Sequence, residues 1–370
     1  MRVPFLDIKA QYCELSEQID QVLHEVISSG MYMMGKHHNA LEEELAYFHG
    51  CRHGIALNSG TDALRIMLDA QGIGPGDEVI TTAFTFVASA ETIAQTGASP
   101  VFVDIDPKTL MIDASKIDAA VTSRTKAIMP IHLFGQLCDV SGVTQAAKRH
   151  GLVVIEDAAQ AIGCSYDGTF AGHFGIAAGL SFYVTKNLGA AGDAGMILSN
   201  DDEIADRCRS IRVHGMGRQR YYYDHIGYTS RMDEIQAAIL RIKLTRLHAW
   251  NETRNRFAQI YLEALEGTGI TPPETSPGNN NTWHQFTVQH ARRDELQAFL
   301  KAREIDSMIY YPVPLHFHEP YKRFSPGAGS LPETERACSQ VLSLPIHQHL
   351  EEDQVRFTAK SLREFAATRA

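Results

Sequence analysis

The sequence lacks paired CxxC cysteines, long apolar runs and any segment with the pattern of a signal peptide. Its six cysteines are scattered along 370 residues, a distribution that fits a reducing compartment and gives no sign of a disulfide framework. No run approaches the roughly 18 apolar residues needed to span a bilayer, and residues 1–30 have the pattern of an amphipathic helix. We therefore expect a cytoplasmic protein without a membrane partner.

Basic residues are also in the minority. The 34 Lys and Arg against 44 Asp and Glu give a formal net charge of −10, which argues against nucleic-acid binding because such binding needs a basic face. The segment RVHGMGRQRYYYDH (212–225) mixes arginine with tyrosine and would suit a nucleotide-diphosphate contact, a dimer-interface loop or a solvated loop. The histidines of HFH (316–318) and HQH (347–349) lack the helical i, i+4 spacing of zinc ligands, so we expect no metal.

Between residues 50 and 200, short apolar runs alternate with helical patterns. In the helix predicted from Thr61 to Gln71, for example, the apolar residues fall on one face. Buried strands that alternate with helices indicate an α/β protein with a mostly parallel sheet covered on both faces, and no short repeat suggests a solenoid. The predicted strands are 53–57, 77–82, 99–105, 126–134, 151–157, 177–184 and 195–199.

The second part of the chain has a different pattern. A long helical stretch is expected from about Arg231 to Leu265, and the segment TPPETSPGNNNT (271–282) has the composition of a connector. Short strands and helices follow, which is typical of a smaller α+β domain. We predict a large domain at 1–247 and a small C-terminal domain at 248–370, on which the N-terminal segment could pack.

A lone lysine lies in the glycine-rich stretch SFYVTKNLGAAGDAG (181–195). Lys186 follows an apolar run, Phe182 to Val184, that we expect to end a strand. Open α/β sheets bind their ligands at the carboxyl ends of strands. Lys186 is therefore a candidate site residue, although most lysines are solvated surface groups.

Two other motifs also come at the ends of predicted strands. In ALNSGTDALRIML (56–68) a turn leads into a helix whose first amides could bind a phosphate. Capping of that helix by Ser59 or Thr61 would produce the same pattern. In VVIEDAAQAIG, the carboxylates Glu156 and Asp157 end a strand; Asp157 could meet a buried cation of a ligand or cap a helix.

An anion-binding turn, a carboxylate and an amine could therefore converge at one edge of the sheet. Pyridoxal phosphate needs this combination: a phosphate site, an acid beside the pyridine nitrogen and an amine for the aldehyde. Lys186 would hold the cofactor as a Schiff base and, once released, act as a general base. Nucleotide binding in a doubly wound fold is the main alternative, although a GxGxxG turn after the first strand is missing.

Several longer motifs carry a resemblance to a known family. They are NSGTDAL, GIGPGDEVITTAFTFVASAE, PVFVDIDP, TKAIMPIHLFGQ, VIEDAAQAIG, SFYVTKNLGAAGDAG, RVHG and GYTSRMDEIQAAIL. Together they resemble the DegT/DnrJ/EryC1/StrS family of sugar aminotransferases, over almost the whole chain. The resemblance implies the aspartate-aminotransferase type of fold (fold type I), a homodimer with sites at the subunit interface, and pyridoxal phosphate, with pyridoxamine phosphate as the intermediate form. It also implies that the substrates are nucleotide-linked keto sugars.

The resemblance implies roles for individual residues as well. Lys186 matches the Schiff-base lysine, Asp157 the partner of the pyridine nitrogen, and Gln160 a residue that lies against the ring and its phenolic oxygen. Phe86 matches the aromatic residue that stacks on the cofactor. The phosphate site would comprise Gly60, Thr61 and Ser181.

Two positions depart from the family pattern. Thr229 stands where relatives usually carry an asparagine that reaches the neighbouring subunit's phosphate; its hydroxyl can still donate a hydrogen bond but reaches less far. Ala194 stands where glycine is usual, which would cause strain if that position needed a positive φ. Lysine at position 186, where some relatives have histidine, argues for transamination rather than dehydration.

The resemblance is greatest to enzymes that aminate C3 of 3-keto sugars linked to dTDP or UDP. The amino donor implied is L-glutamate, and Arg231, Tyr311 and His316 are candidate substrate residues, with structural roles as the alternative. A 4-keto sugar substrate is the close competitor. A different pyridoxal phosphate enzyme, such as a sugar dehydratase or a lyase, and a regulator without turnover are the remaining alternatives.

Overall fold

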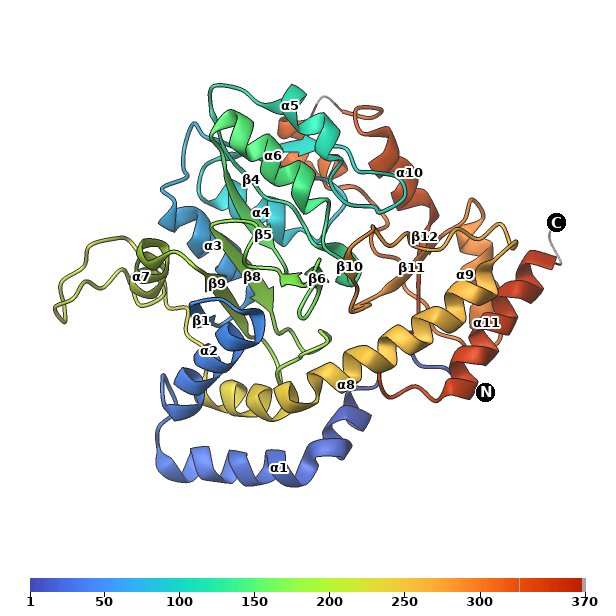
Figure 1. Cartoon of the computed structure of the whole chain (residues 1–370), viewed down its shortest axis with the longest axis horizontal. Coiled ribbons are helices and arrows are strands. Elements are labelled where there is room, and N and C mark those ends of the chain that lie inside the picture. The colour runs from blue at the N-terminus through green and yellow to red at the C-terminus, as the bar shows by residue number, and fades with distance from the viewer. Residues whose placement is uncertain (326, 368–370) are drawn as a thin grey trace.

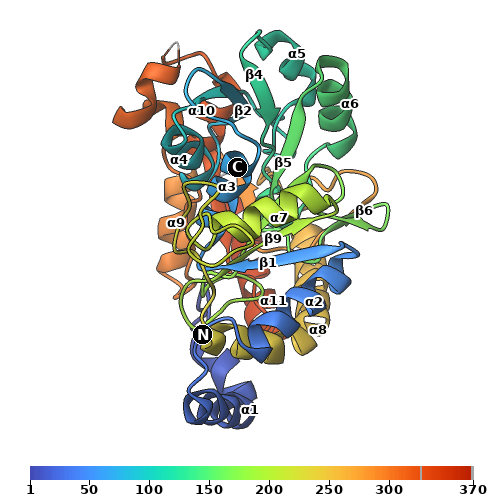
Figure 2. The ribbon, with the colours of Figure 1, turned by 90° about the vertical axis from the view of Figure 1, so that its left-hand side faces the viewer.

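The computed structural model describes residues 1–325 and 327–367, and a seven-stranded sheet forms its centre (Figures 1 and 2). The order of the strands is β1-β9-β8-β5-β4-β2-β3. The α/β class is thus confirmed, and the first and last predicted strands have the observed bounds. The strands are β1 (His53–Leu57), β2 (Glu78–Thr82), β3 (Ser99–Val103), β4 (Thr125–Ile128), β5 (Val153–Asp157), β8 (Ala177–Ser181) and β9 (Gly195–Ser199).

The sheet is mostly parallel, as predicted. Strands β3, β2, β4, β5 and β8 run parallel to their neighbours, whereas β9 is antiparallel to both β8 and β1. β1 therefore points the same way as β8. The carboxyl ends of β1, β2, β5 and β8 consequently meet at one edge of the sheet, which is the edge where such sheets bind ligands.

Helices cover both faces of the sheet, because alternate residues of a strand point to opposite sides. Ile55 and Leu57 pack with α3, α7 and part of α4 on one face, and Ala56 belongs to the core formed with α2, α6 and the first half of α8 on the other. The helices are α2 (Lys36–His49), α3 (Gly60–Ala70), α4 (Ala88–Gln95), α6 (Val140–His150), α7 (Asp202–Ile211) and α8 (Glu234–Leu265).

A separate apolar core lies in the C-terminal part, around the second half of α8 (Figure 1). Val3 from the N-terminus belongs to this core, and its backbone N–H donates to the carbonyl of Glu304 (2.9 Å). A boundary at residue 247 would fall inside α8, and the division into a large domain at 1–247 and a small domain at 248–370 stays a prediction. The elements around this core are β11 (Phe286–Gln289), β12 (Val341–Leu344), α9 (Arg293–Lys301) and α11 (Glu352–Ala367).

The structure corrects two predicted strands and adds others. The strand expected at 126–134 is shorter, because β4 ends at Ile128 and Leu133–Gly135 forms a 3-10 helix. The expected strand at Phe182–Val184 is wrong, because β8 ends at Ser181. Beyond Ser181 the chain turns, and the amide of Lys186 bonds the carbonyl of Tyr183 (2.8 Å). No helix among residues 1–325 and 327–367 is long and apolar enough to cross a membrane. The remaining elements are α1 (Ile8–Ser29), α5 (Ile117–Ala120), α10 (Pro332–Gln340), β6 (Ser165–Tyr166), β7 (Thr169–Phe170) and β10 (Asn279–Asn280).

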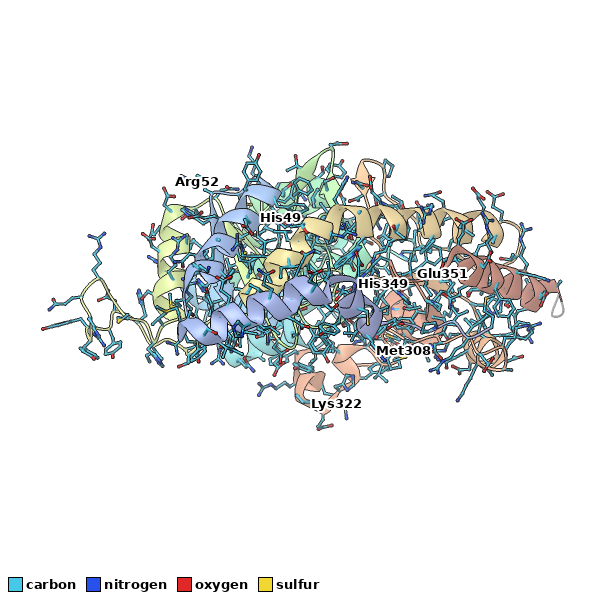
Figure 3. All side chains as sticks on the ribbon, turned by 90° about the horizontal axis from the view of Figure 1, so that it is seen from below. His49, Arg52, Met308, Lys322, His349 and Glu351 are labelled. Carbon is cyan, nitrogen blue, oxygen red and sulfur yellow. The ribbon has the colours of Figure 1, made fainter. Side chains whose placement is uncertain are left out.

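The segment that follows α7 stands away from the body of the molecule, with its side chains extending outward (Figures 1 and 3). We call residues 214–226 the arm. Tyr221, Tyr222, Tyr223 and Ile226 are all exposed in it, Ile226 to 93%. Such a row of exposed apolar side chains is uncommon on a monomer surface and is typical of a contact with another chain.

Candidate active site

A cavity of about 600 Å³ opens at the edge of the sheet where β1, β2, β5 and β8 end. The turn before α3, the carboxylate that ends β5 and the lysine after β8 all line it, so the structure brings together groups that are far apart in the sequence. Eight predicted site residues line the cavity: Gly60, Thr61, Phe86, Asp157, Gln160, Ser181, Lys186 and Tyr311.

Lys186 lies in a tight turn that glycine makes possible. A Cβ atom at Gly189 would lie 2.4 Å from the carbonyl oxygen of Val184, which no side chain tolerates. Burial lowers the pKa of Lys186 to about 8, and the attraction of Asp157 opposes this effect. An amine with such a pKa is partly unprotonated near neutral pH, which suits both a nucleophile and a general base.

Asp157 ends β5 and is buried. Its Oδ2 accepts a hydrogen bond from the Ser89 hydroxyl (2.7 Å), and its Oδ1 accepts one from the Ala159 amide (3.2 Å). Burial raises the pKa of Asp157, whereas these hydrogen bonds lower it. No α-helix begins directly after Asp157, since the next element is β6, so Asp157 does not cap a helix. The buried carboxylate faces a cavity and suits a cationic group of a ligand.

The N-terminus of α3 points into the same cavity. Ser59 does cap the helix, since its hydroxyl accepts a hydrogen bond from the Asp62 amide (3.1 Å), but Ser59, Gly60 and Thr61 also line the cavity. A Cβ atom at Gly60 would lie 2.6 Å from the Cβ atom of Ser181. The glycine therefore allows α3 and the end of β8 to approach closely, and together they form a site suited to an anion.

Ala194 causes none of the strain that a positive φ would bring. The positive φ in this segment falls at Gly192 (φ 147°), while Ala194 has an ordinary φ. The glycine that the fold requires is Gly195, because a Cβ atom there would lie 2.3 Å from the carbonyl of Ser59. Alanine at position 194 is thus compatible with the backbone of the site.

Gln160 and Tyr311 form a hydrogen-bonded pair beside the cavity. Oε1 of Gln160 accepts a hydrogen bond from the Phe134 amide (2.8 Å), which orients the side chain so that its Nε2 donates to the Tyr311 hydroxyl (3.2 Å). Burial raises the pKa of Tyr311, so the phenol is neutral. Because it accepts from Gln160, the Tyr311 hydroxyl keeps its own hydrogen for another group.

Three predicted site residues lie outside the cavity lining. The Thr229 hydroxyl lies 2.9 Å from Nε2 of His214 at the base of the arm. Arg231, two residues further, is half-buried. His316 is buried, and its Nε2 lies 3.2 Å from Oε1 of Glu335; its expected proximity to a sugar stays a prediction. Among the residues that the structure describes, no three His, Cys, Asp or Glu side chains gather as they would around a metal ion.

Ser89 and His284 are two residues at the site that the sequence did not reveal. Ser89 bonds Asp157, and His284 lines the cavity next to Lys186. The stretch FTFVAS contains Ser89 beside the predicted Phe86, but nothing in it indicates which carboxylate the hydroxyl would meet. His284 follows the connector at 271–282 and carries no motif of its own.

The residues present fit pyridoxal phosphate. The cavity combines an anion site at α3, a buried carboxylate, an amine with a lowered pKa and a donor pair at Gln160 and Tyr311. Phe86 adds an aromatic side chain that is 56% exposed and lines the same cavity. A flat ring that bears a phosphate, a protonated ring nitrogen, a phenolic oxygen and an aldehyde would use each of these groups.

Comparison with known proteins agrees with this geometry. The sequence profile of the DegT/DnrJ/EryC1/StrS aminotransferase family matches residues 13–363. The chain belongs to this family. The predicted resemblance and the fold type I architecture of the DegT/DnrJ/EryC1/StrS aminotransferases are therefore confirmed.

Curated relatives in this family cover the whole chain. A pleiotropic regulatory protein of Geobacillus stearothermophilus is 49% identical over 99% of both chains. The dTDP-3-amino-3,4,6-trideoxy-alpha-D-glucose transaminase of Streptomyces venezuelae is 44% identical over 99% of this chain and 96% of its own. A UDP-N-acetyl-3-dehydro-alpha-D-glucosamine 3-aminotransferase of Acidithiobacillus ferrooxidans is 42% identical over 98% and 97%.

Solved structures of the family superpose closely on this chain. S. venezuelae DesV, in complex with a ketimine intermediate, has a TM-score of 0.96 at 44% identity and covers 99% of this chain and 98% of its own. NtdA of Bacillus subtilis, with bound cofactor PMP, has a TM-score of 0.91 at 33% identity over 98% and 85%. The chain therefore shares the complete aminotransferase fold.

Proposed function

We propose that this protein is a pyridoxal phosphate-dependent aminotransferase that moves an amino group from L-glutamate to a keto carbon of a nucleotide-linked deoxysugar. The observation that carries the proposal is the meeting of Lys186, Asp157 and the N-terminus of α3 in one cavity. The membership of the chain in an aminotransferase family supports it.

Each residue would have a defined task. Pyridoxal phosphate, when bound, supplies an electron-withdrawing ring that stabilises negative charge on the substrate carbon. Asp157 would keep the ring nitrogen protonated, and the amides of Gly60 and Thr61 with the Ser181 hydroxyl would bind the phosphate. Phe86, Gln160 and, from the neighbouring subunit, Thr229 would complete the cofactor site.

Lys186 would act twice in this scheme. It would first hold the cofactor covalently, and once the amino donor had displaced it, its free Nζ would take up and return a proton at the substrate Cα. The same proton steps run in the opposite direction when the keto sugar takes up the amine. The pKa of about 8 leaves Nζ able both to accept and to give a proton near neutral pH.

The keto carbon that we favour is C3 of a dTDP- or UDP-linked sugar. The names of the relatives that are 44% and 42% identical describe a 3-amino product or 3-amination, one on a dTDP sugar and one on a UDP sugar. Tyr311 would contact the sugar from inside the cavity. The alternatives are a 4-keto sugar as substrate and another fold type I reaction, such as sugar dehydration or a lyase reaction.

We further infer a cytoplasmic homodimer whose subunits share their active sites. The exposed tyrosines of the arm support this assembly, because they would be covered by a second copy of the chain. Thr229 and Arg231, at the base of the arm, would then face the partner's site. The expected partners are L-glutamate, the nucleotide sugar and the second subunit, with neither nucleic acid nor membrane.

A regulator without turnover is the second candidate, because one relative that is 49% identical carries the name of a regulatory protein. Lys186, Asp157 and Gln160 are all present and face one cavity, which favours the enzyme.

The decisive experiment adds L-glutamate and then keto sugars to the cofactor-loaded protein. Glutamate should convert the absorbance of bound pyridoxal phosphate to that of pyridoxamine phosphate, and a 3-keto dTDP or UDP sugar should restore it faster than a 4-keto sugar. Borohydride reduction followed by mass mapping should place a phosphopyridoxyl group on Lys186, and the K186A variant should lack it. No conversion by glutamate would reject the aminotransferase, and absence of the adduct as well would favour the regulator.

A further inference from the structure

The turn between β1 and α3 carries the amides to which we assign the phosphate. The last residue pair in the ladder between β1 and β9 is Leu57 with Gly195, and α3 begins at Gly60. Asn58 and Ser59 lie between the two elements, and Asn58 is exposed. Neither the sheet nor the helix therefore fixes Asn58, and the position of the turn depends on contacts with other parts of the chain.

One such contact comes from Ser230, at the base of the arm. Its hydroxyl donates a 2.9 Å hydrogen bond to Oδ1 of Asn58, across 172 positions of the sequence. Ser230 is buried, so its hydroxyl has no access to bulk solvent. Within residues 1–325 and 327–367, no other side-chain hydrogen bond joins residues 58–61 to another element, since the hydroxyl of Ser59 bonds inside α3.

The other close contacts of the turn only limit its movement. The backbone at Gly60 packs against Ser181, and the carbonyl of Ser59 packs against Gly195, so closely that a Cβ atom on either glycine would clash. These contacts keep the turn from moving further towards β8 and β9, but they do not attract it. The hydrogen bond from Ser230 supplies an attraction.

The backbone of Ser230 is held in place without its hydroxyl. Its amide donates to the carbonyl of Arg212 (3.0 Å). The buried guanidinium of Arg212 in turn donates to the carbonyl of Ala56 in β1 (3.0 Å) and pairs with Glu42. Position 230 is thus tied to the strand that leads into the turn, and we expect the backbone to stay there when the hydroxyl is removed.

The same segment also holds the far end of α3. The hydroxyl of Tyr228 donates to Oδ2 of Asp69 (2.7 Å), and the guanidinium of Arg65 lies 4.1 Å from the centre of the Tyr228 ring. Residues 228–230 therefore contact both ends of the helix. Because Tyr228 holds the far end, the contact of Ser230 with Asn58 acts on the turn at the N-terminus.

We propose that Ser230 is a positioning residue for the phosphate of the cofactor, and that it acts through Asn58 on the turn whose amides, at Gly60 and Thr61, bind that phosphate. This inference rests on the proposed function and deepens it. Amides at a helix N-terminus bind an anion when they point at it together, and a turn that is already fixed loses less freedom on binding. Thr229 and Arg231 would face the partner's site, so neighbouring residues would serve two sites.

A comparison of two ligands tests this role. Pyridoxal has the ring and the aldehyde of pyridoxal phosphate but no phosphate. In the full-length protein freed of cofactor, S230A should weaken the binding of pyridoxal phosphate roughly three- to tenfold and leave the binding of pyridoxal unchanged, both measured by equilibrium dialysis. S343A is the matched control, because Ser343 is also buried and its hydroxyl lies 2.8 Å from that of Thr287, in β11. Neither affinity should change in S343A.

A second variant removes the same bond from its other side. N58A changes an exposed residue, so it tests the bond even if S230A does not fold. It should show the same selective loss of affinity for pyridoxal phosphate. If the two side chains act through one hydrogen bond, the protein with both substitutions should bind pyridoxal phosphate no more weakly than either single variant.

Three results would overturn the inference. They are an unchanged affinity of S230A or N58A for pyridoxal phosphate, an equal loss for pyridoxal, which would indicate a general loosening of the site, and losses that add up in the double variant. Failure of the proposed function has a different signature. A wild type that binds pyridoxal phosphate but does not react with L-glutamate would reject the aminotransferase alone, whereas a wild type that binds it no better than pyridoxal would reject the phosphate site as well.

Discussion

The Ser89 hydroxyl donates a 2.7 Å hydrogen bond to Oδ2 of Asp157. Both side chains are buried, and they come from α4 and β5. Burial raises the pKa of Asp157, and the bond from Ser89 is the largest of the effects that lower it. Ser89 would thus be a positioning residue that helps to keep the carboxylate ionised for the ring nitrogen that we propose Asp157 to meet.

We expect S89A to raise the pKa of Asp157 and to weaken the protonation of the cofactor ring. A hydrogen bond to a charged group contributes about 1.5–3 kcal/mol, so kcat should fall about tenfold or more. The measurement is kcat together with the pH dependence of the absorbance of the bound cofactor. S89T, which keeps the hydroxyl, is the matched control. Equal spectra and rates for S89A and the wild type would show that the bond has no role at the ring.

The close approach of α3 to β8 gives a second prediction. In G60A, the new Cβ would lie 2.6 Å from the Cβ atom of Ser181, so the N-terminus of α3 must move away from the phosphate site. We expect the affinity for pyridoxal phosphate, measured by equilibrium dialysis, to fall about tenfold. In the control G74A the nearest heavy atom is 3.6 Å away, an ordinary contact, and affinity should be unchanged. Unchanged affinity in G60A would place the phosphate elsewhere.

The pair formed by Gln160 and Tyr311 gives a third prediction. Y311F removes the hydroxyl hydrogen available to the cavity and leaves Nε2 of Gln160 without its acceptor. We expect kcat/KM to fall about tenfold, since an unpaired buried donor costs roughly 1–3 kcal/mol. Y310F is the natural control, because Tyr310 lines the same cavity. A larger loss in Y310F than in Y311F would contradict the assigned hydrogen bond.

The local pattern of apolar and turn residues in the sequence predicted much of the fold and part of the site. Short apolar runs predicted β1 and β9 with their observed bounds, and the ends of predicted strands pointed to Lys186, Asp157 and Gly60. The strand expected at Phe182–Val184 failed because an apolar run satisfies the pattern even where the chain leaves the sheet.

Residues whose role depends on distant partners could not be predicted. Ser89 meets Asp157 across 68 positions, and Asn187 meets His284 across 97. Neither pair has a characteristic spacing, since the tertiary fold alone brings the partners together. The buried contact of His316 with Glu335 likewise depends on the tertiary fold, and the expected position of His316 near the sugar stays a prediction.

Lys243 of α8 provides a last prediction, about stability. Its Nζ donates to the carbonyl of Gly189 (2.6 Å), in the turn that follows Lys186, and to Oε1 of Gln11 (2.8 Å). Both acceptors are neutral, and burial lowers the pKa of Lys243 to about 8. An unfolded lysine keeps its proton up to about pH 10.4. Between these values the unfolded chain binds more protons, so this group makes the folded state more stable as the pH rises.

The pH dependence of the wild type alone would not reveal this effect. Burial raises the pKa of Cys164 and Cys208 to about 12, so these thiols lower stability as the pH rises through the range where unfolded thiols ionise. The wild type and K243M share these thiols, however, so the contribution of the thiols cancels in the difference between the unfolding free energies of the two proteins.

This difference in the free energy of unfolding between the wild type and K243M should change in favour of the wild type by about 3 kcal/mol at most between pH 7.5 and 10.5. Urea unfolding of the cofactor-free proteins at both pH values measures it, and K360M, at a lysine 74% exposed, should show no such change. A pH-independent difference for K243M would mean that Lys243 is protonated in the folded protein throughout this range.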